Sequence, residues 1–165
     1  MSKEIRRDVR LAFIIFLISA AGMTSVFWGC RGLAWIVIVS SDLYLSIVLL
    51  LAALLSDDEG FLNRHPWITG FLPRRRTAGL LVVMLLFVAV VSGFAGLYVG
   101  GEVFSSVKTP LDAFYISSFT LALTDYSPKP GYGQLVVLGQ LVSSILLLVA
   151  LFPLLISRIS TFKHL

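Results

Sequence analysis

The sequence predicts an all-helical membrane protein with four spanning helices and one shorter helix between the third and fourth spans. Of the 165 residues, 58% are hydrophobic and 13% are charged, a composition typical of integral membrane proteins rather than of soluble domains. The hydrophobic residues gather into four runs, each long enough to cross a hydrocarbon core about 30 Å thick. The stretch from Thr109 to Pro128 breaks this pattern, because polar residues and a helix-start signal interrupt an apolar region.

The first two runs predict a helical hairpin. Four basic residues precede an uncharged run from Leu11 to Gly29, which is long enough to span and has no cleavage site followed by a soluble domain. We therefore predict a retained transmembrane helix rather than a signal peptide. Residues 30–32 are too few for anything but a tight turn, and residues 33–55 bring the chain back across.

Asp42 is the one ionisable residue well inside an apolar run. Such a group is costly in lipid and is by default a candidate for function, here an ion pathway or a sensor. The alternative is structural, with a neutral Asp42 facing neighbouring helices and bonded to residues such as Ser40, Ser41 or Tyr44. We favour the structural interpretation.

Residues 56–77 form the one sizeable polar connection and separate an N-terminal unit, 1–77, from a C-terminal unit, 78–165. Its tribasic run, Arg74, Arg75 and Arg76, is expected to serve as a topology signal, with anionic lipid binding as the alternative. His65 has no second ligand at metal spacing, so no metal site is expected. The third span, Ala78 to Gly100, offers close-approach points for a neighbouring helix at Gly79, Gly93 and Gly96.

The short helix is predicted from its start signal. Thr109 can cap it, with Pro110 at the first position and Asp112 in the first turn, and the apolar pattern extends to about Leu123. A helix of this length cannot span, so we expect it to enter and leave on one side and to line a water-filled cavity. Gly131-Tyr132-Gly133 is predicted to be the turn before the last span, which runs from about residue 133 to 157.

The basic residues predict the topology. With the amino terminus in the cytoplasm, ten of the 13 Lys and Arg residues lie inside and three, Arg31, Lys108 and Lys129, lie outside. The positive-inside rule therefore predicts four spans with both termini cytoplasmic and the short helix on the outer side. The net charge of +4 is distributed beside span ends, so it does not indicate nucleic-acid binding.

The stretch after Thr109 resembles the pore helix and filter region of potassium channels that have two transmembrane helices and one pore loop. The matching positions are Leu111-Asp112-Ala113, Tyr115, Ser117, Thr120-Leu121, Asp125, Ser127, Pro128, Gly133, Gln134 and Gln140. The resemblance covers roughly residues 78–159, and its pore part runs from Leu111 to Ile159. It implies a homotetramer of the potassium-channel-like type, in which Asp112 and Tyr115 support the pore helix.

The chain departs from that family at the filter. The filter-like residues are Thr120, Leu121, Ala122, Leu123, Thr124 and Asp125, and they lack the GYG whose carbonyls replace the hydration shell of potassium. We therefore expect monovalent cations to permeate with weak potassium selectivity and divalent cations to act near Asp125. Ser144 occupies the position of the hinge glycine in the inner helix, and Pro153 is the alternative hinge or gate.

The predicted function is a tetrameric cation channel of a bacterial plasma membrane, whose partners are its own copies and membrane lipids. The alternatives are a channel relative that does not conduct, with Leu121 and Leu123 closing the axis, and a small membrane protein that acts through lipid or protein partners. An enzyme is not expected, because no nucleophile and base pair or metal cluster is found in the sequence, and no cofactor is predicted. The conducted ion, the gating stimulus and the role of the first two helices do not follow from the residues.

Overall fold

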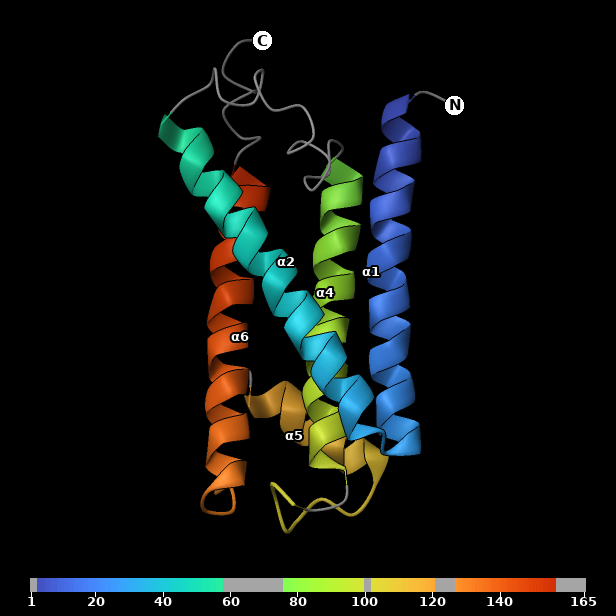
Figure 1. Ribbon diagram of the computed structural model, residues 1–165, viewed down its shortest axis with the longest axis vertical. Coiled ribbons are helices and arrows are strands. Elements are labelled where there is room, and N and C mark those ends of the chain that lie inside the picture. The colour runs from blue at the N-terminus through green and yellow to red at the C-terminus, as the bar shows by residue number, and fades with distance from the viewer. Residues whose placement is uncertain (1–2, 58–75, 100–101, 121–126, 157–165) are drawn as a thin grey trace.

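The computed structural model describes residues 3–57, 76–99, 102–120 and 127–156, and this part of the chain is all helical (Figure 1). The long helices are α1 (Lys3–Trp28), α2 (Arg31–Asp57), α4 (Arg76–Tyr98) and α6 (Tyr132–Ile156), and α5 (Pro110–Thr120) is short. Within these described ranges, four helices are long and apolar enough to cross a membrane. The prediction of four candidate spans is confirmed, and the chain is compatible with a multi-pass membrane protein.

The four long helices run along the bundle, and α5 lies across one end of it (Figure 1). We call this the α5 end. It also holds the α1–α2 turn, residues 102–109 and the start of α6, whereas the first residues of α1 lie at the opposite end. The turn is tight because Gly29 adopts a left-handed conformation with φ of 63°, which glycine adopts without steric penalty.

The hydrophobic core consists of two clusters, and both contain residues from α1, α2, α4 and α6. One cluster joins Val26 of α1 and Ala34 of α2 to Val90 and Phe94 of α4, to Ile116 of α5 and to residues of α6. A second cluster, toward the opposite end, joins Ile15, Leu45, Leu86 and Leu147. The α1–α2 hairpin is therefore packed into the bundle.

Small residues allow α1, α2 and α4 to approach closely. A Cβ added to Gly96 would lie 2.3 Å from the Ser25 hydroxyl and 3.0 Å from the Ala34 Cβ, and one added to Gly93 would lie 2.9 Å from a γ carbon of Ile38. On α1, a Cβ added to Gly22 would lie 2.2 Å from the Ser92 hydroxyl of α4. Two of the three glycines predicted as close-approach points, Gly93 and Gly96, thus have that role.

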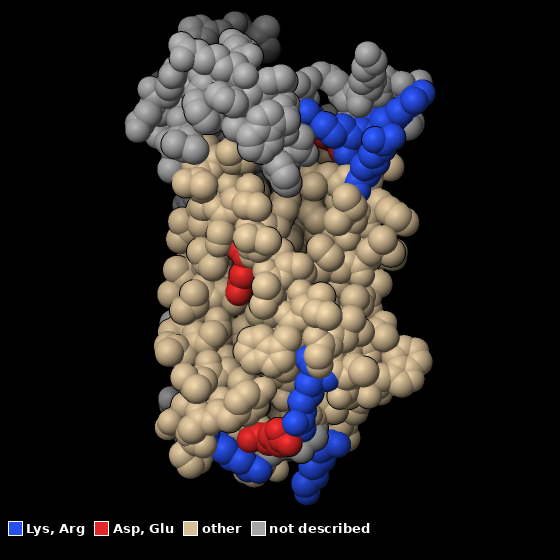
Figure 2. All heavy atoms as spheres, viewed as in Figure 1, with Lys and Arg blue, Asp and Glu red and all other residues tan. Residues whose placement is uncertain are grey.

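Charged side chains lie at the two ends of the bundle, with a broad apolar band between them that acidic atoms interrupt about midway (Figure 2). At the α5 end, Arg31 and Glu102 form an ion pair at 2.6 Å, with both side chains about half exposed. This ion pair joins residues 102–109 to the first residue of α2. Exposed pairs of this kind add little stability.

Candidate functional site: a short helix held between two spanning helices

Helix α5 begins where the sequence predicts, with a reciprocal cap. The Asp112 backbone N–H donates to the Thr109 hydroxyl at 3.2 Å, and the Asp112 carboxylate accepts from the backbone N–H groups of Thr109 at 2.9 Å and Lys108 at 3.1 Å. These contacts satisfy backbone donors that a helix start leaves without partners, and they place a negative charge at its positive end. Asp112 therefore caps the start of α5.

The Asp112 cap should make the thermal stability of the protein depend on pH. Hydrogen bonds from the Thr109 side chain, then from the backbone of Thr109 and Lys108, hold the pKa of the Asp112 carboxyl below its ordinary value. A lowered pKa means that the cap contributes stability above the ordinary value and loses it as the pH falls through the lowered one. We expect the thermal midpoint of the wild type to fall modestly on acidification. Asp112→Asn should have a lower midpoint at neutral pH and a smaller acid-induced fall. An equal fall in both proteins would contradict this assignment.

A buried polar network ties α5 to α4 and α6. The Tyr98 hydroxyl of α4 donates to Gln140 Oε1 of α6. The Gln140 amide then donates to the backbone carbonyl of Ser117 at 2.7 Å and to its hydroxyl at 3.1 Å, and that hydroxyl donates to the Val91 carbonyl at 2.8 Å. Tyr98, Ser117 and Gln140 are each fully buried. We call these three residues the α5 anchor, because buried bonds of this kind fix the position of α5 against both helices.

The connection into α6 is a turn at Pro130 and Gly131, and α6 starts at Tyr132. Gly131 has a φ of 80°, which favours glycine, and a Cβ on Gly133 would lie 3.0 Å from the Val103 carbonyl oxygen. Gly131-Tyr132-Gly133 is therefore the turn and first residues of the helix, as predicted. The backbone N–H of Lys129 donates to the same Val103 carbonyl at 2.8 Å, which joins the start of α6 to residues 102–109.

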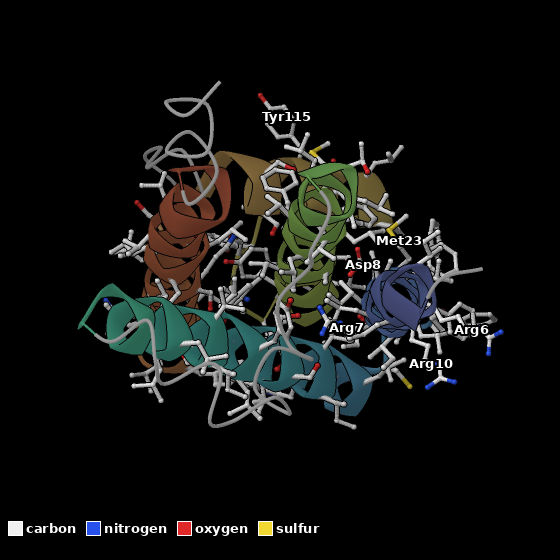
Figure 3. The ribbon with its side chains drawn as sticks, turned by 90° about the horizontal axis from the view of Figure 1, so that it is seen from above. Arg6, Arg7, Asp8, Arg10, Met23 and Tyr115 are labelled. Atoms are coloured by element: carbon white, nitrogen blue, oxygen red, sulfur yellow. The ribbon has the colours of Figure 1, made fainter. Side chains whose placement is uncertain are left out.

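The other predicted pore residues are placed in part. Tyr115 points away from α4 on the outer side of α5 and is 56% exposed (Figure 3). Thr120 is the last residue of α5. Leu121, Ala122, Leu123, Thr124 and Asp125 lie outside the described residues, as do Arg74 and Arg75, while Arg76 begins α4.

The chain matches no protein-family model, no curated protein and no solved structure. What the α5 region can do therefore follows from its own geometry. Within the described residues no group of His, Cys, Asp and Glu side chains could hold a metal ion. The region offers instead a short helix of fixed position with an anchored middle and an acidic, capped start.

Asp42 lies where α2 packs against α6. Its Oδ2 accepts a hydrogen bond from the Ser143 hydroxyl at 2.7 Å, and its Oδ1 is buried without a hydrogen-bond partner. The expectation of local serine partners was wrong: Ser40 donates to the Val37 carbonyl of its own helix, and the buried Ser41 hydroxyl makes no hydrogen bond. The partner comes from a helix a hundred residues along the chain, which sequence proximity could not indicate.

The two predicted hinge positions both fall within α6. The Ser144 hydroxyl donates to the Gln140 carbonyl at 2.6 Å, a bond within its own helix, and Pro153 lies three residues before Ile156, where α6 ends. Sequence reasoning did not assign roles to Gln140, Ser117 and Ser143. Their signal was the presence of amide and hydroxyl groups inside otherwise apolar helices, where polar side chains usually find a partner on another helix.

Proposed function

We propose that this chain is the subunit of a homotetrameric cation channel that conducts monovalent cations with weak potassium selectivity. The observation that carries the proposal is α5, a short capped helix anchored across one end of the bundle between α4 and α6. Its 11 residues correspond to about 16 Å, too short to span a hydrocarbon core, and the helix lies across the bundle rather than along it. A helix that enters the membrane part-way and leaves on the same side needs a wet cavity for the chain that follows it.

The exposed faces of α5 and α6 support assembly from several copies. Along α6 an apolar stripe recurs at spacings of three and four residues through Leu135, Leu138, Val142 and Ile145, all more than half exposed. On α5, Leu111 and Tyr115 are exposed on the face away from the core. One subunit with one short helix lines only part of an axis. Four copies around that axis would enclose it and cover these faces.

The proposal is tested first by assembly and flux. Native mass measurement of the purified protein in detergent should give four chains, and liposomes containing it should pass monovalent cations. A stable monomer or dimer would remove the channel proposal. Four chains without flux would favour the alternative of a relative that does not conduct.

Selectivity provides a sharper prediction. A potassium filter stacks several rings of carbonyls, and residues 121–124 are too few to supply that stack. We expect reversal potentials in mixed sodium and potassium to show weak discrimination, and Asp125→Asn to reduce cation flux or block by divalent ions. Asp112→Asn is the matched control, since Asp112 caps α5 and should leave ion preference unchanged. Strong potassium preference in the wild type would contradict the proposed pore.

A further inference from the structure

We propose that Asp42 and Ser143 form a proton-binding site in the middle of the membrane, and that the bound proton holds α2 against α6. The two residues lie at matching depths. Asp42 is eleven residues from Arg31, and Ser143 is eleven residues from Tyr132, the residues at which α2 and α6 start at the α5 end. At 1.5 Å per residue each lies about 16 Å along its helix, near the centre of a bilayer.

The hydrogen bonds are those of a carboxylic acid rather than of a carboxylate. An ionised carboxylate has about four acceptor sites, yet among the described residues only Ser143 bonds to Asp42, and Oδ1 is buried without a partner. The Ser143 hydroxyl also lies 3.0 Å from the Gly139 carbonyl, and its single hydrogen can satisfy fully only one acceptor. With a proton on Asp42 Oδ2, the acid donates to Ser143 and Ser143 donates to Gly139. The Asp42–Ser143 contact and the Ser143–Gly139 contact then each contain one hydrogen atom.

No cation compensates a charge on Asp42 within the described helices. Three helices pack against α2. In α4 the charged and titratable residues are Arg76 at its start and Tyr98 at its end, and in α6 there is Tyr132 at its start. The charges of α1 lie between residues 3 and 10, and α2 itself carries Arg31, Tyr44 and Asp57 besides Asp42. An isolated carboxylate at this depth is far less stable than the neutral acid.

Loss of the proton would weaken the contact between the helices. The carboxylate would draw the Ser143 hydroxyl away from Gly139 and would still have a buried, unpaired Oδ1. The remaining α2–α6 contact is apolar, through the cluster that contains Leu45, Val48 and Leu147. Moving the charge toward water requires α2 and α6 to separate at this level. Any effect on ion flux rests on the proposed function, whereas proton binding itself does not.

Infrared difference spectra of the protein in liposomes test the proton site. Stepping the pH upward from neutral should remove a protonated-carboxyl C=O band in the wild type and in the control Asp112→Asn, but not in Asp42→Asn, which has no such band. Ser143→Ala should shift the band to higher frequency, because a hydrogen bond is lost. A wild-type spectrum with carboxylate bands alone at neutral pH, or a band indifferent to Ser143→Ala, would overturn the proposal.

Distance measurements test whether the bound proton keeps α2 packed against α6. Spin labels at the exposed positions Leu50 and Leu148, in a Cys30→Ser background diluted with unlabelled protein, report the α2–α6 separation within one subunit. We expect the separation to increase with pH in the wild type and to stay constant in Asp42→Asn, whose amide keeps a donor and cannot ionise. A constant wild-type separation would overturn the second half of the proposal. Neither the infrared band nor the spin-label distance requires the protein to conduct ions. Failure of the channel proposal can therefore be distinguished from failure of the proton site.

Discussion

Replacing Gln140 by leucine is expected to lower the free energy of unfolding by about 2 kcal/mol, because the partners of a buried amide are left without bonds. The variant leaves the Tyr98 hydroxyl without its acceptor and the Ser117 carbonyl and hydroxyl without their donor. Leucine fits the apolar surroundings in size, so the loss reports the hydrogen bonds rather than a cavity. Unfolding in increasing amounts of denaturing detergent, followed by circular dichroism, measures it.

Gln134→Leu is the matched control for this experiment. Gln134 is on the same helix, but it is exposed and its amide oxygen accepts one long bond, 3.3 Å, from the backbone N–H of Gly131. Its replacement should change stability by less than about 0.5 kcal/mol, as surface substitutions usually do. If both variants behaved alike, the α5 anchor would not determine the position of α5.

Gly96→Ala is expected to destabilise the protein by about 1–3 kcal/mol, the usual cost of forcing extra atoms into a packed core. The Ser25 hydroxyl can rotate away from the new Cβ, but the Ala34 Cβ at 3.0 Å and the Ser25 Cβ at 3.2 Å cannot. The helices α1 and α2 must therefore move away from α4. The same detergent unfolding experiment measures the effect.

Gly139→Ala provides the comparison, because the nearest atom to its added Cβ is Phe94 Cε1 at 3.9 Å, an ordinary contact. Alanine has the higher helix propensity, so this variant should be neutral or more stable by up to about 1 kcal/mol. A similar loss at Gly139 and Gly96 would mean that glycine matters for the flexibility of these helices and not for their close approach.

The sequence predicted the elements of this fold because each had a local cause. Four long apolar runs identified the candidate spans, and Thr109, Pro110 and Asp112 identified the start of α5 to the residue. The turn at Gly131 likewise followed from its Pro-Gly pair. Helix α5 is described as far as Thr120, and residues 121–126 are not described. The prediction that this helix runs to about Leu123 therefore stays a prediction.

The partners of the polar side chains could not be predicted, because they depend on which helices cross and at what depth. Asp42 was a candidate from its position alone, yet its partner Ser143 follows from the crossing of α2 and α6. Similarly, Gln140 and Ser117 meet because α5 lies against both α4 and α6. Chain distance carries no information about such pairs.

The packing of α1 has a consequence for the order in which the protein can be made. Helix α1 contacts α4 more extensively than it contacts α2, its neighbour in the chain. Ser19 illustrates this, since its hydroxyl donates to the Leu85 carbonyl of α4 at 2.7 Å. As the ribosome delivers the chain, α1 and α2 reach the bilayer while the surface that covers Ser19 and Gly22 is still unsynthesised. The α1–α2 hairpin therefore cannot complete its packing until α4 has been synthesised and inserted.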